Sequence, residues 1–309
     1  MRTAALRLFF IVGLQLACPA AIVADPAEGL YWSVQRDGEV AGYLLGTIHS
    51  EDPRVLDFSE AFLEQVNSCS KFAMEIVPDL PTLARLAEVM LLPEGQSLPG
   101  LIGDDLYAQV SVALGSYGIP DAQLRRMKPW AAMMTLSVPP PETGFFMDFS
   151  LSLRAAGSGL EVIGLETLDE QLGFLENMSL GMQRDMLVQA VAEAGQVHAA
   201  HDKLVELYLA NDLAALEEEA RAQMADVGDQ ARAYFIEHGI ELRNQRMFDR
   251  LQAALAGDRV FVAVGALHLP GDTGLIRLLR QAGYRLQPLP LPFGSDSAAE
   301  SGALTAQSR

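Results

Sequence analysis

Two histidines follow glycines at the same spacing, near opposite ends of the chain. The apolar run Tyr43–Leu45 leads into Gly46-Thr47-Ile48-His49, and Phe261–Val264 leads into Gly265-Ala266-Leu267-His268. A glycine at a strand end permits a turn and the close approach of another group, and ligands of open α/β sheets bind at strand ends. Because neutral imidazole is a common ligand of divalent metals, His49 and His268 are candidate metal ligands or acid–base groups. A single motif of this kind is weak, so a structural role for each histidine is the alternative.

Two glutamates lie within or directly after other apolar runs. Glu75 interrupts Phe72–Val77, and Glu166 follows Gly164-Leu165. A carboxylate among apolar neighbours is costly unless it meets a cation, a metal ion or strong hydrogen-bond donors. Two imidazoles with one or two carboxylates therefore predict a divalent-metal site that keeps positions for water. Such a metal would polarise a carbonyl and acidify water, while a second carboxylate relays protons.

Six short apolar segments are expected as the strands that position these residues. Their composition and bounding turn residues are typical of strands, and the Asp37-Gly38 pair predicts a hairpin between the first two. The expected strands are Leu30–Gln35, Val40–Leu45, Phe72–Val77, Glu161–Leu165, Arg259–Val264 and Tyr284–Leu289.

Helical patterns occupy most of the remaining chain. Helices are expected at Phe58–Ser68, Leu80–Met90, Asp104–Tyr117, Lys128–Leu136, Asp148–Ala156 and Gly274–Ala282. Nearly continuous helix is expected from Asp169 to Arg250, with breaks near Gly195, Asn211, Gly228 and Gly239. The sequence therefore predicts an α/β (α+β) fold with a mixed β-sheet flanked by helices, in which two pseudo-related halves are separated by a helical block.

The composition excludes some classes of partner and enzyme. With 22 Lys and Arg against 40 Asp and Glu, the chain carries a formal charge of −18, which repels nucleic acid and anionic lipid. We therefore expect no nucleic-acid partner. The sequence has no Gly-x-Ser-x-Gly elbow, no His-Glu-x-x-His helix and no glycine-rich phosphate loop, which disfavours a serine hydrolase and an ordinary zincin.

The two ends of the chain differ in composition from the rest. Arg2 and Arg7, then the apolar run Leu8–Leu16 and small residues, predict a secretory signal peptide over residues 1–24. We therefore expect export, to the periplasm or beyond the cell, and no transmembrane segment in the mature chain. Residues 291–309 are small and polar, which indicates a disordered tail.

Six motifs occur in order along the chain: GTIH, MEIV, KPWAA, GLET followed by Gln171, RNQRM, and VGALHLPGDTGLIRLLRQAGY. Together they resemble the TraB/PrgY/GumN family, and most of all its GumN-like bacterial branch. The resemblance covers about residues 28–290 and implies a single domain over 25–290. The family is related to the Tiki proteins, membrane-anchored metalloproteases of animals that depend on manganese or cobalt.

The resemblance implies roles for individual residues. His49 and His268 match the two motif histidines, Glu75 matches the acidic residue after the first of them, and Arg243 matches the family's basic residue. Glu166 fits the GLET pattern. Arg243 would pair with a carboxylate of the site or stabilise a developing oxyanion.

The function implied is a divalent-metal-dependent hydrolase, first of all a metallopeptidase, with a peptide or protein substrate. Manganese or cobalt is expected, with zinc as a further option. Two alternatives follow from relatives of the family. One is a binding protein that captures a peptide or haem without turnover, and the other is a metal-free esterase with His49 as general base.

Overall fold

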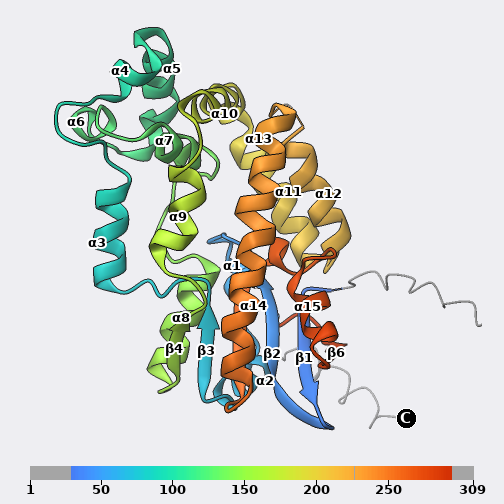
Figure 1. Cartoon of the computed structure of the whole chain (residues 1–309). Coiled ribbons are helices and arrows are strands. Elements are labelled where there is room, and N and C mark those ends of the chain that lie inside the picture. Colours follow the sequence, from blue (N-terminus) through green and yellow to red (C-terminus); the bar gives the residue numbers. More distant parts are fainter. Residues whose placement is uncertain (1–28, 226, 294–309) are drawn as a thin grey trace, which may run out of the picture.

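The fold is built on a six-stranded mixed sheet (Figure 1). The structure is a computed structural model that describes residues 29–225 and 227–293. The strands are β1 Tyr31–Arg36, β2 Glu39–Thr47, β3 Lys71–Met74, β4 Glu161–Gly164, β5 Val260–Gly265 and β6 Arg285–Pro288. Their order across the sheet is β4-β3-β5-β2-β1-β6. A strand lies at each of the six predicted places and the predicted fold class is confirmed, with both predicted halves contributing strands to this one sheet. The third strand is shorter than predicted: β3 ends at Met74, so Glu75 follows the strand and does not interrupt it.

The direction of the strands divides the sheet into two parts. β1 and β2 form an antiparallel hairpin, and β6 runs antiparallel to β1. Asp37 and Gly38 close the hairpin with φ of 53° and 89°, the positive values that a tight hairpin turn requires. β2, β5, β3 and β4 are all parallel to one another.

The parallel strands bring the two Gly-x-x-His motifs together. β2 and β5 are neighbours, with Gly46 opposite Val264 and Thr47 opposite Gly265. The carboxyl ends of parallel strands meet at one edge of a sheet, so both motifs leave the sheet side by side. β3 and β4 end at the same edge, immediately before the segments that carry Glu75 and Glu166. The five strand residues of β5 before Gly265 are all buried, as expected of a central parallel strand.

Helices account for most of the other residues. The α-helices are α1 Pro53–Leu56, α2 Glu60–Asn67, α3 Leu80–Val89, α4 Leu98–Ile102, α5 Asp104–Ala113, α6 Asp121–Leu124, α7 Pro129–Leu136, α8 Met147–Gly157, α9 Leu168–Glu176, α10 Leu180–Glu193, α11 Val197–Leu209, α12 Leu213–Gln223, α13 Asp229–Tyr234, α14 Leu242–Leu255 and α15 Leu275–Gln281. Short 3₁₀ helices are η1 Leu114–Tyr117, η2 Ala194–Gln196 and η4 Ala266–His268. The predicted helices are confirmed, as are the breaks at Gly195, Asn211 and Gly228.

The break predicted at Gly239 is wrong. A π-helical segment, η3 Phe235–Glu241, passes through this glycine and joins α13 to α14 without a turn. Gly239 is buried, and a Cβ added there would lie 3.3 Å from the ring of Phe174. The glycine therefore serves close packing between η3 and α9 rather than chain reversal.

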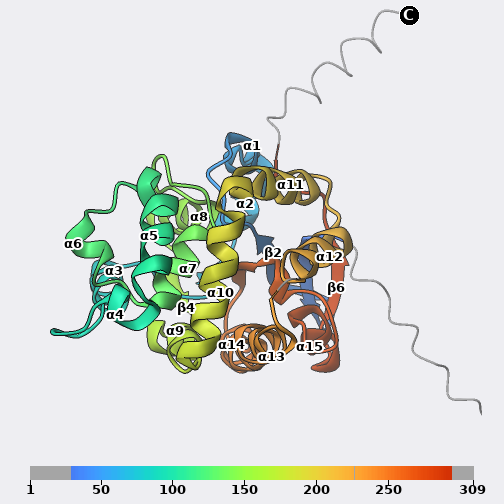
Figure 2. The ribbon, with the colours of Figure 1, turned by 90° about the horizontal axis from the view of Figure 1, so that it is seen from above.

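The described residues form two hydrophobic cores. One lies around the sheet and includes residues of α8, α11, α14 and α15. The other lies within a helical block that includes α4, α5, α7, α10 and α13. The block lies on the side to which the parallel strands run (Figure 1), and α10 passes between α7 and α12 in the view from above (Figure 2).

The predicted signal peptide lies outside the described residues. The described chain reaches Phe293, which forms an isolated β-bridge with Phe58, and the rest of the predicted tail lies outside. Within 29–225 and 227–293, no helix combines the length and apolar character needed to cross a membrane.

Candidate functional site

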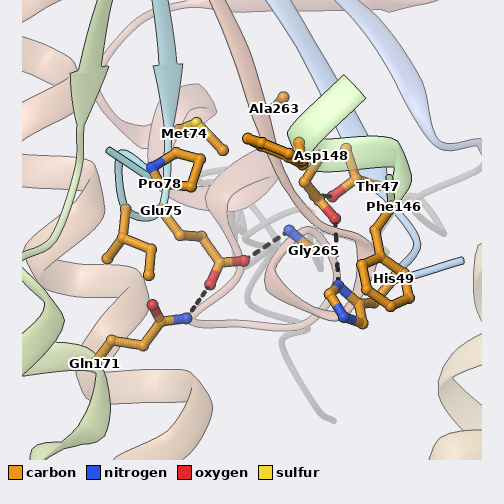
Figure 3. Close-up of a pocket in the computed structure, with 12 residues that line it drawn as sticks. Thr47, His49, Met74, Glu75, Pro78, Phe146, Asp148, Gln171, Ala263 and Gly265 are labelled. Atoms are coloured by element: carbon orange, nitrogen blue, oxygen red, sulfur yellow. Dashed lines mark hydrogen bonds and ion pairs between the residues drawn. The ribbon is translucent and has the colours of Figure 1, made fainter. Parts of the chain in front are cut away.

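A pocket of about 340 Å³ opens at the carboxyl ends of β2, β3 and β5 (Figure 3). Segments from five elements meet there: the ends of these three strands and the first turns of α8 and α9. The lining residues are Thr47, His49, Met74, Glu75, Ile76, Pro78, Phe146, Asp148, Phe149, Gln171, Ala263 and Gly265. Six of these residues are apolar, five have polar side chains and one is a glycine. The polar side chains include two of the predicted site residues, His49 and Glu75.

The carboxylate of Glu75 is held by three donors. Oε1 accepts a hydrogen bond from the backbone N–H of Gly265 at 2.9 Å. Oε2 accepts hydrogen bonds from Nε2 of Gln171 at 2.8 Å and from Nη2 of Arg243 at 2.5 Å. These contacts supply the cation and the donors that a carboxylate needs at a mostly buried position.

Gly265 is expected to tolerate no side chain, which makes a first prediction. A Cβ at this position would lie 3.1 Å from Oε1 of Glu75, and the carboxylate cannot shift without disturbing the hydrogen bonds that Gln171 and Arg243 donate to its Oε2. Gly265→Ala should therefore lower the free energy of unfolding by about 1–3 kcal/mol, the usual cost of overpacking. The measurement is chemical denaturation, with Gly257→Ala as control because a Cβ there meets nothing within 4 Å. Equal stability of the two variants would contradict a rigid Glu75.

Arg243 joins Glu75 to Glu166 behind the pocket. Its Nε donates to Oε2 of Glu166 at 2.8 Å, and its Nη2 lies 2.7 Å from the same oxygen. Arg246 donates to Oε1 of Glu166 at 3.2 Å. The side chain of Glu166 is 0% exposed, so both of its oxygens face arginines rather than the pocket. The structure thus places Glu166 as a partner of Arg243 and Arg246.

The charges of this cluster follow from burial and contact. Burial alone would raise the pKa of Glu75, but His268, Arg243 and the N–H of Gly265 outweigh it and lower that pKa to about 2. Burial lowers the pKa of His268 to about 4, although Glu75 opposes the shift. At neutral pH Glu75 is therefore ionised and His268 is neutral, so Arg243 is the cation that balances Glu75.

His268 lies behind Glu75 rather than in the pocket wall. It is 4% exposed, and its Nδ1 lies 2.6 Å from Oδ1 of Asn244. An amide oxygen only accepts, so Nδ1 carries the proton and Nε2 keeps its lone pair. This Nε2 lies 3.7 Å from Oε1 of Glu75. Nε2 of His268 and Oε1 of Glu75 both present lone pairs at this distance, and a cation or a shared proton between them would stabilise the arrangement.

His49 lies on another wall of the same pocket, at the start of the segment after β2 (Figure 3). Its side chain is 59% exposed, and its Nδ1 lies 3.8 Å from Oδ2 of Asp148. The ring of Phe146 stacks on the imidazole with a centroid separation of 3.7 Å and an interplanar angle of 16°. The site therefore contains two imidazole–carboxylate pairs, His268 with Glu75 and His49 with Asp148.

The side chains of these two pairs are of the kinds that bind divalent cations, but they do not converge on one point. Each pair offers an imidazole nitrogen whose other ring nitrogen faces an oxygen, the usual environment of a metal-ligating histidine. Within the described part of the chain, no three His, Cys, Asp or Glu side chains converge as a group that could hold a metal ion. The residue types therefore fit a divalent metal ion. Glu75 and His268 would supply two adjacent ligands, and His49 is a candidate for a further one.

Several residues of the site were not singled out from the sequence. Asp148 counted only as the first residue of an expected helix, and Asn244 and Arg246 only as letters of the RNQRM motif. Gln171 was quoted in a motif without a role. Only Asn244 had an available signal in its spacing along α14, because Arg243, Asn244, Met247 and Leu251 all lie on the buried side of this helix.

The chain belongs to the TraB/PrgY/gumN family, whose model matches residues 30–288. It is similar to metalloprotease TIKI1 of Danio rerio, with 26% identity over 91% of this chain and 67% of that protein. It is also similar to metalloprotease TIKI2 of Xenopus tropicalis, with 25% identity over 86% of this chain and 61% of the relative. For metalloprotease TIKI1 of Homo sapiens the identity is 23%, over 84% and 61%. The chain thus spans about three fifths to two thirds of the length of these relatives, and no solved structure matches it.

Proposed function

We propose that the chain is a divalent-metal-dependent hydrolase that acts on peptide bonds of a peptide or protein substrate. The observation that carries this proposal is the parallel pairing of β2 and β5, which brings both Gly-x-x-His motifs to one sheet edge beside Glu75. The family and its relatives named metalloprotease support the reaction class. The secretory pattern of the first residues supports an exported location, periplasmic or secreted.

The charge and exposure of each residue in the site indicate its role in the proposed reaction. A bound manganese, cobalt or zinc ion would supply Lewis acidity that polarises the scissile carbonyl. Oε1 of Glu75 and Nε2 of His268 would hold it. A carboxylate with a pKa of about 2 is a weak base near neutral pH, so Glu75 acts as a ligand rather than as a proton acceptor.

His49 and Arg243 have different tasks in this scheme. His49 is the exposed imidazole of the pocket, and its Nε2 either completes the ligand set or moves a proton to and from the substrate. Arg243 keeps Glu75 ionised and in place through the contact between Nη2 and Oε2. Glu166 holds Arg243 in turn, so its contribution to the chemistry is indirect.

Metal titration tests the proposal. Calorimetric titration of the purified chain with manganese, cobalt and zinc should show one of them binding as a single ion per chain, and His268→Ala should abolish binding. Loss of binding in His49→Ala would make His49 a ligand, whereas intact binding with lost peptide cleavage would make it the proton carrier. His198→Ala, on an exposed helix position, is the matched control. Absence of binding in wild type, or unchanged binding in His268→Ala, would contradict the metal site.

Metal-free ester hydrolysis is the second candidate function. The approach of Asp148 to Nδ1 of His49 favours it, because a carboxylate on one ring nitrogen makes the other a better general base. The test is ester turnover in the presence of a chelator. Turnover that persists without metal and disappears in His49→Ala would support this candidate over the metallopeptidase, and absence of turnover would exclude it.

A further inference from the structure

Two segments far apart in the sequence are joined along their length beside the pocket. They are residues 47–51, which follow β2 and carry His49, and residues 142–148, which lead into α8. At one end the carboxylate of Glu51 accepts hydrogen bonds from the N–H groups of Glu142 at 2.7 Å and Thr143 at 3.1 Å, and from the N–H of Gly144. The hydroxyl of Thr143 also donates to it at 2.7 Å. The second segment is thereby fixed to the turn that follows His49.

The contacts continue toward the pocket. The N–H of Met147 donates to the carbonyl of Ser50 at 3.1 Å. Phe146 stacks on the ring of His49 and fixes its plane. The hydroxyl of Thr47 donates to Oδ1 of Asp148. The joined segments therefore position the backbone, the ring plane and the carboxylate that lie around one imidazole.

The orientation of the Asp148 carboxylate follows from these contacts. Because Oδ1 is taken by Thr47, Oδ2 is the oxygen that lies toward Nδ1 of His49, at 3.8 Å (Figure 3). This distance is longer than a hydrogen bond, and catalytic contacts are often long without substrate and shorten into hydrogen bonds in the working complex. No Lys or Arg side chain of the described residues forms a salt bridge with Asp148, and the imidazole of His49 lies beside its free oxygen.

We propose that Asp148 is a positioning residue that holds His49 as the Nδ1–H tautomer and so leaves the Nε2 lone pair available in the pocket. A neutral imidazole has one N–H and one acceptor nitrogen, and the partner of one nitrogen selects the tautomer. A carboxylate accepts only, so its partner nitrogen must carry the proton. The tautomer itself does not depend on the proposed function. Only the role of Nε2 of His49, as metal ligand or as base, rests on that function.

Asp148→Asn makes a sharp test because it changes one atom of the carboxyl group. The amide oxygen is expected to keep the hydrogen bond from Thr47, which turns the amide nitrogen toward His49. An amide nitrogen only donates, so Nδ1 must accept and the proton moves to Nε2. An asparagine in place of a histidine-orienting aspartate imposes the wrong tautomer in this way in serine proteases.

The measurement is long-range ¹H–¹⁵N correlation NMR of the chain labelled at its histidines, free of metal, at about pH 8 where neutral imidazole dominates. His49→Gln identifies the signals of His49. Wild type should show His49 with a protonated Nδ1, and Asp148→Asn should show it with a protonated Nε2. Asp52→Asn is the matched control, because Asp52 caps α1 and contacts Arg54 rather than His49, and it should leave the tautomer unchanged.

Two results would overturn the proposal: an Nε2–H tautomer of His49 in wild type, or the same tautomer in wild type and Asp148→Asn. If Asp148→Asn does not fold, the wild-type spectrum alone decides, since it needs only the His49→Gln reference. The readout uses neither metal nor substrate, so its failure leaves the metal titration untouched, and failure of that titration leaves the tautomer result intact. In the metal-binding assay, Asp148→Asn should weaken affinity about 10–100-fold if His49 is a ligand.

Discussion

Arg243→Leu is expected to lower the free energy of unfolding by about 3–5 kcal/mol, the cost of removing one partner from a buried ion cluster. Arg243 is 6% exposed and contacts two carboxylates, Glu75 and Glu166. Glu166 would keep only the weaker contact to Arg246, and Glu75 would keep the N–H of Gly265 and the amide of Gln171. The loss is a large fraction of the roughly 5–15 kcal/mol that usually stabilises a folded chain. Urea denaturation followed by circular dichroism measures it.

The matched control is Arg250→Leu, which removes an ion pair with Glu170 that is more exposed than the Arg243 cluster. The Arg250 side chain is 43% exposed, and exposed ion pairs contribute about 0–1 kcal/mol. The double variant Arg243→Leu/Glu166→Leu should be more stable than Arg243→Leu alone, since it also removes the stranded charge of Glu166. An equal loss in the single and double variants would show that packing of the arginine stem, and not charge, accounts for the effect.

The fold could be predicted largely from local patterns. Strands such as β2 and β5 contain a short apolar run bounded by turn residues, and Asp37-Gly38 specifies its own hairpin. The local patterns contain no information on which strands become neighbours. The pairing of β2 with β5, which turns two weak motifs into one site, is a contact between the two ends of the chain. Gly239 shows the opposite error: the glycine predicted a break, but packing against Phe174 keeps the helix continuous.

The site was predictable where a residue conflicts with its local surroundings. Glu75 stands out because a carboxylate in an apolar run of the sequence needs partners, and the structure supplies Arg243, Gln171 and Gly265. Asp148 has no such conflict, because an acidic residue in the first turn of a helix is ordinary. Its approach to His49 depends on the joined segments 47–51 and 142–148, which only the tertiary structure reveals.

His268 is expected to make the metal-free protein less stable as the pH falls from about 6.5 to about 4. Its pKa is lowered in the folded chain from 6.5 to about 4, because burial disfavours the charged imidazole. Between these values the unfolded chain binds the proton and the folded chain does not, so acid favours unfolding. The contribution is complete above pH 6.5 and is lost as the pH falls through this window, by about 3 kcal/mol in all.

Denaturation curves of wild type and His268→Gln, taken in chelator at several pH values, measure this effect. The variant should lose less stability than wild type between pH 6.5 and 4, while His198→Gln, at an exposed position, should follow wild type. Glu75 also has a lowered pKa, but it titrates from its ordinary 4.5 toward about 2, so its contribution is lost mainly below this window. Parallel curves for wild type and His268→Gln would contradict the prediction, because they would mean that the pKa of His268 is the same in the folded and the unfolded chain. If wild type instead gained stability relative to His268→Gln as the pH fell, the folded chain would bind a proton at His268 more tightly than the unfolded chain does. That proton would lie between Nε2 and Glu75, in the position proposed for a metal ion.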